Sequence, residues 1–132
     1  MNNEHIKIGR LGERAAARFL RRKGCRILAR NHHEGKNELD LIVKDGCYIA
    51  FVEVKTRAFD SADEADIRPS QAVDLKKRLR TRDAAFAYLR EHPTTLCPRL
   101  DVIEVYLDRS CRLKPFKINH IPGAFSPNGS LR

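Results

Sequence analysis

The sequence predicts an α/β protein with the element order α-β-β-β-α-β-β, and three observations support this fold class. Two basic segments, residues 7–23 and 71–91, carry apolar side chains at helical spacing. Between and after them, apolar and polar residues alternate as in half-buried strands. The length of 132 residues is close to the commonest size of one domain. We therefore expect one domain over residues 1–120 and a flexible C-terminal tail over residues 121–132.

A helix and three strands are expected in the first half of the chain. Gly24 ends the helix, because glycine is the usual residue after a helix C-terminus. The apolar stripe of the helix consists of Ile8, Leu11, Ala15, Ala16, Phe19 and Leu20. The strands are expected at 25–31, 37–44 and 47–57, with a loop at 32–36.

The second and third strands should form a hairpin, since Asp45-Gly46 favours a turn whose two central residues have positive φ. Such a turn pairs Asp40 with Phe51 and Glu38 with Glu53. The apolar residues expected on one face of the first hairpin strand are Leu39, Leu41 and Val43.

The second half of the chain begins with an acidic loop and continues with a helix and two strands. Ser70 can cap a helix from Gln71 to Glu91. Strands follow at 99–107 and 111–119. The last strand is expected at the edge of the sheet, because Pro115 has no N–H for a central ladder.

Charged residues interrupt the hairpin at positions where a core would favour valine or leucine. Side chains alternate along a strand and opposed residues share a face, so Asp40, Glu53 and Lys55 lie on one side of the sheet. Glu38 joins them if the register holds. Carboxylates this close repel one another, and a divalent cation would offset the repulsion. Mg²⁺ prefers one or two carboxylates together with waters and substrate phosphates.

Asp40 and Glu53 are therefore candidate ligands of Mg²⁺, with Mn²⁺ as a substitute. Lys55 lies two residues beyond Glu53, about 7 Å along a strand, where it can steady the charge on an attacked phosphate. The alternative is a solvated sheet face with cross-strand ion pairs. The apolar neighbours Phe51, Val52 and Val54 favour a buried strand over that alternative.

The motifs "GRLGERAA", "NELDLIV" and "FVEVKTR" resemble the YraN-like family of the PD-(D/E)XK nuclease superfamily, which is related to Holliday-junction resolvases. The resemblance covers about residues 9–107 and implies a restriction-endonuclease-like mixed sheet flanked by helices, with Mg²⁺-dependent cleavage of phosphodiesters. It implies that Asp40 and Glu53 are metal ligands and that Lys55 is the motif lysine. Glu13 matches the helix glutamate that completes such metal sites; the alternative for Glu13 is an acid favoured by the helix dipole. Asn37 departs from the glycine usual before "ELDL".

The formal charge of +9 indicates a polyanionic partner, with nucleic acid before anionic lipid. The candidate phosphate contacts are Arg18, Arg21, Arg22, Arg57, Lys76, Lys77 and Arg80. No apolar run is long enough for a transmembrane helix, and the N-terminal residues lack a signal peptide, so a cytoplasmic location is expected. The four cysteines are widely spaced, which favours buried thiols over a zinc site.

The leading hypothesis is an endonuclease that cleaves DNA, with branched or damaged structures as candidate substrates. A homodimer is compatible with a nuclease that cuts junctions. The first alternative is a non-catalytic nucleic-acid-binding or scaffold protein on a nuclease fold, because fold does not dictate function. A second alternative, binding of an acidic protein partner, explains the charge but not the three carboxylates together.

Overall fold

The computed structural model describes residues 3–60 and 75–126 of the chain. In sequence order, its elements are α1 (Asn3–Arg22), β1 (Arg26–Glu34), β2 (Asn37–Asp45), β3 (Tyr48–Phe59), α2 (Leu75–Glu91), β4 (Cys97–Asp108), a short 3₁₀ turn (Arg109–Cys111) and β5 (Lys114–Ile121). The predicted α/β fold and element order are confirmed. The predicted cap at Ser70 and the first residues of the second helix lie outside the described residues.

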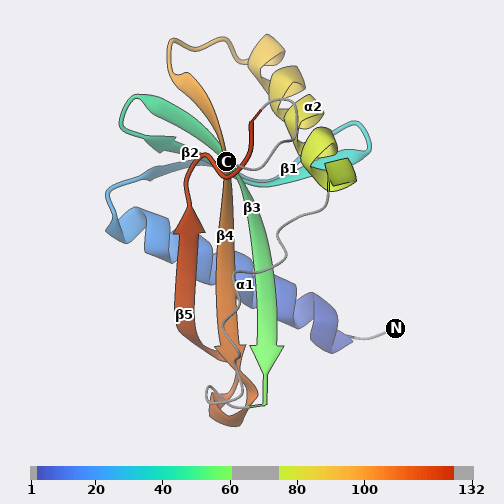
Figure 1. The fold of residues 1–132 in the computed structure, drawn as a ribbon, viewed down its shortest axis with the longest axis vertical. Helices are drawn as coiled ribbons and strands as arrows, with labels where there is room; N and C mark the ends of the chain where they lie inside the picture. The colour runs from blue at the N-terminus through green and yellow to red at the C-terminus, as the bar shows by residue number, and fades with distance from the viewer. Residues whose placement is uncertain (1–2, 61–74, 127–132) are drawn as a thin grey trace.

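The five strands form one mixed sheet in the order β1-β2-β3-β4-β5. Only β3 and β4 run parallel, and α2 lies in the connection between them. Figure 1 shows α1 crossing one face of the sheet and α2 lying against the other face near the β1–β2 hairpin. β5 is an edge strand, as its Pro115 predicted.

The hairpin between β2 and β3 differs from its predicted register by two residues. Asp45 pairs with Tyr48, so the turn consists of Gly46 and Cys47 rather than Asp45 and Gly46. Gly46 adopts the positive φ of 59° that the turn requires. The predicted pairs of Asp40 with Phe51 and of Glu38 with Glu53 are therefore wrong. Because a shift of two residues preserves the alternation of faces, it moves side chains along the strand without turning them over.

Each face of the sheet has its own apolar core. The core under α1 includes Leu20, Leu41, Val43, Val52 and Val105, and the core under α2 includes Leu39, Ile42, Phe51, Ala84 and Phe125. The expectation that Leu39, Leu41 and Val43 share one face is wrong, since Leu39 packs in the α2 core. Pairing of β2 with β3 stops at Leu41–Val52, and β2 turns toward α2 beyond this point, as Figure 1 shows. Leu39 therefore follows that turn.

Several strands are longer than predicted because tertiary pairing extends them. His32, His33 and Glu34, expected in a loop, continue β1 and pair with β2. Pairing with β3 extends β4 to Cys97 at one end and to Asp108 at the other. α1 begins at Asn3, before its apolar stripe, and Gly24 follows its end with a φ of 90°. Periodicity located these elements, and strand partners fixed their lengths.

Residues 121–125 pack against the sheet. Gly123 N donates to Asp101 Oδ1 over 2.9 Å, and Asp101 also accepts bonds from Arg99 and His120. Phe125 is buried in the α2 core. This part of the segment expected as a tail is therefore held by Asp101, whose side chain is fully buried. Residues 127–132 lie outside the described residues.

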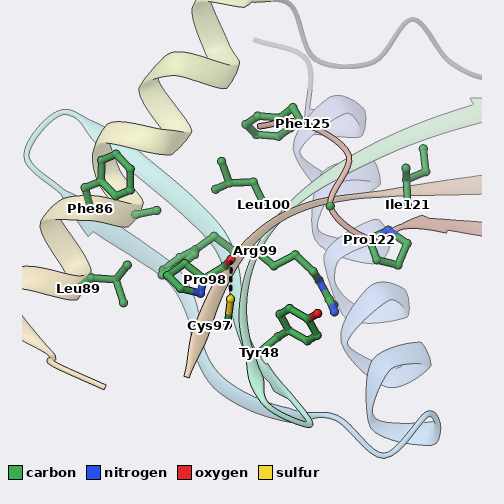
Figure 2. A pocket seen from close by; sticks show the side chains of 13 residues that line it. Tyr48, Phe86, Leu89, Cys97, Pro98, Arg99, Leu100, Ile121, Pro122 and Phe125 are labelled. Carbon is green, nitrogen blue, oxygen red and sulfur yellow. Dashed lines mark hydrogen bonds between the residues drawn. The ribbon is translucent and has the colours of Figure 1, made fainter. Parts of the chain in front are cut away.

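An apolar hollow of about 770 Å³ lies between α2 and the first half of β4. Figure 2 shows Phe86 and Leu89 of α2 on one side of it and Tyr48, Pro98 and Phe125 around the rest. None of the four predicted site residues Glu13, Asp40, Glu53 and Lys55 lines this hollow. Within the described residues, no helix is long and apolar enough to cross a membrane.

Candidate metal centre

The candidate site lies where β2 separates from β3. Beyond the pair Leu41–Val52, the described residues of the two strands form no further pairs. Val54 N donates instead to Asp40 Oδ2 over 2.8 Å. The Asp40 carboxylate therefore takes the place of a backbone carbonyl at the opening of the sheet. This hydrogen bond fixes the orientation of the side chain and satisfies the Val54 N–H.

Glu13 reaches the opening from α1. The preceding residue, Gly12, is buried against β3, and a Cβ at Gly12 would lie 1.7 Å from Thr56 Oγ1. Only glycine lets the helix approach the strand this closely. The contact between Gly12 and Thr56 therefore sets the distance between Glu13 and the strand residues.

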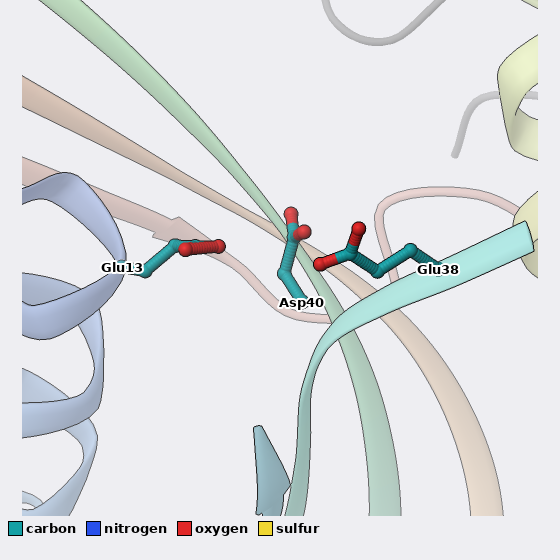
Figure 3. Close-up of side chains that lie close together, drawn as sticks. All are labelled: Glu13, Glu38 and Asp40. Atoms are coloured by element: carbon teal, nitrogen blue, oxygen red, sulfur yellow. The ribbon is translucent and has the colours of Figure 1, made fainter. Parts of the chain in front are cut away.

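Three carboxylates converge at this point. Oxygens of Glu13, Glu38 and Asp40 all lie within 4.8 Å of one another. Figure 3 shows Glu13 entering from α1 and facing Asp40 and Glu38 of β2. Oxygen-rich clusters of this kind suit hard cations such as Mg²⁺ and Mn²⁺, whereas the absence of thiol and imidazole ligands from the cluster makes it less suitable for zinc. The donor set therefore fits the cation that the sequence predicts.

Glu53 lies beside this cluster and is engaged by a cation from α2. Its side chain is nearly fully buried, at 2% exposure, and forms an ion pair with Lys77 Nζ. Glu53 is not one of the three converging carboxylates; Glu38 takes that place. The sequence identified Glu38 only on condition of a register that the structure does not have. It gave no signal for the ion pair, because Lys77 is 24 positions away from Glu53.

Lys55 lines the same hollow as Glu13, Asp40, Glu53 and Lys77, a space of about 220 Å³ next to the start of α1. Its side chain is exposed, and its charge favours the ionised form of Glu53. The four residues predicted from the motifs therefore surround one space. Lys55 and Lys77 flank the carboxylates from two different elements.

Burial and mutual repulsion disfavour the charges of these carboxylates. The pKa of Asp40 is raised to about 7, first by burial and then by the negative charge of Glu53, while the hydrogen bond from Val54 opposes the shift. Burial also raises the pKa of Glu53, although Lys77 opposes the shift. The pKa of Glu13 is raised by burial, then by the charges of Asp40 and Glu38. Such a cluster gains from a counter-charge that replaces protons.

Basic side chains border the cluster on its α2 side. A neighbouring hollow of about 470 Å³ shares Asp40 and Lys77 with the 220 Å³ space that Lys55 lines. It is also lined by Lys36, Arg80 and Glu38. The pKa of Lys77 is raised, because the bond and the charge of Glu53 outweigh burial. Acidic groups that hold a cation next to cations that hold phosphate oxygens form a common arrangement for phosphodiester chemistry.

The predicted phosphate contacts separate into two groups in the structure. Lys77 and Arg80 border the carboxylates. Arg18 and Arg22 lie instead along a groove between α1 and β5, and Arg22 is nine residues, or about 14 Å of helix, beyond Glu13. Arg57 lies on β3 with its Nε buried and unpaired among the described residues. Arg57, like Arg21 and Lys76, lines neither the hollows beside the carboxylates nor this groove.

Residues 12–105 match Uncharacterised protein family UPF0102. The chain belongs to this family. A UPF0102 protein of Pelotomaculum thermopropionicum is 43% identical over 120 residues, which cover 89% of this chain and 94% of that protein. One of Solibacter usitatus is 43% identical over 120 residues, covering 89% and 84%. One of Bacteroides thetaiotaomicron is 36% identical over 124 residues, covering 94% and 96%. The matched segment contains Glu13 and both hairpin motifs.

Proposed function

We propose that this UPF0102 protein is a metal-dependent endonuclease of the PD-(D/E)XK type that acts on DNA. The observation that carries the proposal is the convergence of Glu13, Glu38 and Asp40 at the opening between β2 and β3, with Lys55 beside them. A structural role alone gives no reason to gather three acids whose charges disfavour one another. A Mg²⁺ or Mn²⁺ ion and a phosphodiester give such a reason.

The carboxylates of Glu13, Glu38 and Asp40 would hold the cation, and Glu53 lies close enough to Asp40 to interact with its charge. The bound cation would supply a Lewis acid for the scissile phosphate and lower the pKa of the attacking water. Asp40 is held in position by the Val54 N–H, so it needs no reorientation. Because its pKa is raised to about 7, part of the Asp40 carboxyl is protonated near neutral pH, and binding of the cation would displace that proton.

Lys55 and Lys77 have separate tasks in this proposal. Lys55 is exposed beside the carboxylates and can stabilise the charge that develops on the attacked phosphate. Lys77 holds Glu53 and can exchange this partner for a phosphate oxygen when a substrate arrives. Arg80 and Lys36 border the same site and would bind neighbouring phosphates.

DNA is proposed as the substrate because the chain carries a charge of +9 and its basic residues border the carboxylates. Among the described residues, no phenylalanine, tyrosine or tryptophan lines the two hollows beside the carboxylates. This composition favours contacts with the duplex backbone over contacts with single-stranded bases. Branched duplexes are the candidate substrates, and a homodimer would present two such sites to one junction.

The second candidate is a nucleic-acid-binding scaffold without catalysis, and the ion pair of Glu53 with Lys77 favours it. A glutamate neutralised by lysine is unavailable to a cation. If that pair persists with bound DNA, the fold would bind phosphates without cutting them. Binding without cleavage is the outcome that this candidate requires.

The test is cleavage of labelled linear, single-stranded, flap and four-way-junction DNA with Mg²⁺ or Mn²⁺. We expect Asp40→Asn, Glu53→Gln and Lys55→Ala each to abolish cleavage while the fold is retained. Lys44→Ala is the matched control, because Lys44 is an exposed lysine of the same hairpin. Cleavage that survives the triple variant would come from a contaminating nuclease. Binding of DNA by an inactive wild-type protein would favour the scaffold.

A further inference from the structure

The side-chain amide of Asn31 in β1 lies between two of the three converging carboxylates. With its nitrogen toward them, Nδ2 lies 3.0 and 3.2 Å from the two Glu13 oxygens and 3.1 Å from Glu38 Oε1. The opposite orientation would direct the amide oxygen at the same acceptors without any donor among them. Because amide orientation is assigned from hydrogen-bond partners, the nitrogen is the atom that faces the carboxylates.

The backbone of Asn31 has an unusual conformation that supports a specific task. Its φ is 48°, in the left-handed region, although the residue lies within a strand and not in a turn. Asparagine tolerates this region better than most residues with a side chain. Strained backbone of this kind clusters at functional sites. Asn31 lies between the pairs Arg30–Leu41 and His32–Leu39, which places it across from Asp40.

The amide bridges residues that otherwise repel. Glu13 belongs to α1 and Glu38 to β2, and the charge of Glu38 is one cause of the raised pKa of Glu13. Within the described residues, neither carboxylate forms an ion pair with a lysine or arginine, although the charges of Arg30 and Arg10 act on Glu13 from a distance. An amide NH₂ can donate to both at once. It therefore offers a neutral link that leaves both carboxylates charged.

We propose that Asn31 is a positioning residue that holds Glu13 and Glu38 together, at ligand distance from Asp40, before a cation binds. The inference rests on the proposed metal site and assigns the preorganisation of that site to one amide. Residues that orient metal ligands affect metal affinity by about 10- to 100-fold. Asn31 should therefore affect the affinity for a cation and not only the stability of the fold.

Two substitutions at Asn31 separate these effects. Asn31→Gly removes the amide and accepts the positive φ, so we expect Mn²⁺ affinity to fall at least about tenfold. Asn31→Asp keeps the shape and replaces the donor with another carboxylate. It should lower the melting temperature of the metal-free protein and strengthen Mn²⁺ binding, because a fourth anionic oxygen faces the cation. Mn²⁺ binding is measured by isothermal titration calorimetry and by the loss of the electron paramagnetic resonance signal of free Mn²⁺.

Asn119→Ala is the matched control. Asn119 Nδ2 donates a hydrogen bond of 2.9 Å to Glu104 Oε1, and neither residue belongs to the three converging carboxylates. The substitution should lower the melting temperature and leave Mn²⁺ affinity unchanged. The proposal is overturned if Asn31→Gly binds Mn²⁺ as tightly as the wild type. A wild-type protein that binds no Mn²⁺ would instead overturn the metal site and the proposed function with it.

Discussion

Gly12 of α1 and Thr56 of β3 are in such close contact that a Cβ added to Gly12 would lie 1.7 Å from Thr56 Oγ1 and 2.7 Å from Thr56 Cβ. This contact brings Glu13, the next residue of the helix, to the opening between β2 and β3. Since the closest atoms belong to a β-branched side chain on a strand, the helix itself must move to accept any larger residue.

We predict that Gly12→Ala moves α1 away from β3 and weakens Mn²⁺ binding. The cost of overpacking, roughly 1–3 kcal/mol or more, should exceed the helix propensity gained from alanine. Gly9→Ala is the matched control, because nothing lies within 4 Å of a Cβ at Gly9. Urea unfolding should show a loss of stability for Gly12→Ala and a small gain for Gly9→Ala. Equal stabilities would mean that the helix adapts to the added methyl group at no cost.

Asp40→Asn should have opposite effects on stability with and without a cation. In chelator, the substitution removes a charge that burial and Glu53 disfavour and keeps an acceptor for Val54 N–H, so the melting temperature should rise. In Mg²⁺, the wild type should gain about 1.4 kcal/mol at tenfold excess over Kd, and the variant should lose most of this gain. Thermal melts of both proteins, each in chelator and in Mg²⁺, give the four melting temperatures that this comparison needs.

Asp45→Asn is the control of matched chemistry for that experiment. The bond from Arg99 lowers the pKa of Asp45, so its charge is favoured in the folded state. Its substitution should lower the melting temperature in chelator and leave the gain from Mg²⁺ intact. If Asp40→Asn also melts lower than the wild type in chelator, and Mg²⁺ stabilises neither, Asp40 serves only to satisfy Val54 N–H.

The metal-free protein should become less stable as the pH rises from about 5 to about 7. The pKa of Asp40 is raised to about 7 in the folded protein, so the folded state binds more protons than the unfolded state over this interval. Glu13 and Glu53 have raised pKa values and act in the same direction. Urea unfolding in chelator at several pH values measures the slope of the unfolding free energy against pH. Comparison with Asp40→Asn isolates the contribution of Asp40, because all other ionisable groups are common to both proteins.

Arg80 and Lys36 should contribute to the salt dependence of DNA binding. Each lies at the hollow beside the carboxylates, so each lost phosphate contact should reduce the slope of log affinity against log salt by about one. Arg109→Ala should leave the slope unchanged, because Glu4 already pairs with Arg109. Titrations at several salt concentrations measure these slopes. A slope near zero in the wild type would exclude binding through the phosphate backbone.

Arg18→Ala and Arg22→Ala extend the same measurement to the groove between α1 and β5. A lower slope in these variants would show that bound DNA spans about 14 Å of α1 beyond Glu13. An unchanged slope would restrict the phosphate contacts to the carboxylate side. The two outcomes therefore define how much of the helix faces the nucleic acid.

The sequence alone determined which segments form helices and strands, and it placed Asp40, Glu53 and Lys55 near one another. These features depend on local patterns: periodicity sets the element type, and a tight hairpin turn brings its two strands into contact. The hairpin register could not be read off in the same way. A shift of two residues leaves the alternation unchanged, and only the observed turn at Gly46 and Cys47 decides between the two registers.

The tertiary structure alone decided which side chains complete the site. Lys77 meets Glu53 because α2 packs against the face of the sheet that carries Phe51 and Glu53, and Asn31 meets Glu13 because α1 crosses beneath the opening. These contacts join elements that are far apart in the sequence. Their geometry depends on helix packing and on the close approach at Gly12, and neither leaves a periodic pattern in the chain. The sequence therefore determined the acidic hairpin, and packing determined which residues from other elements meet it.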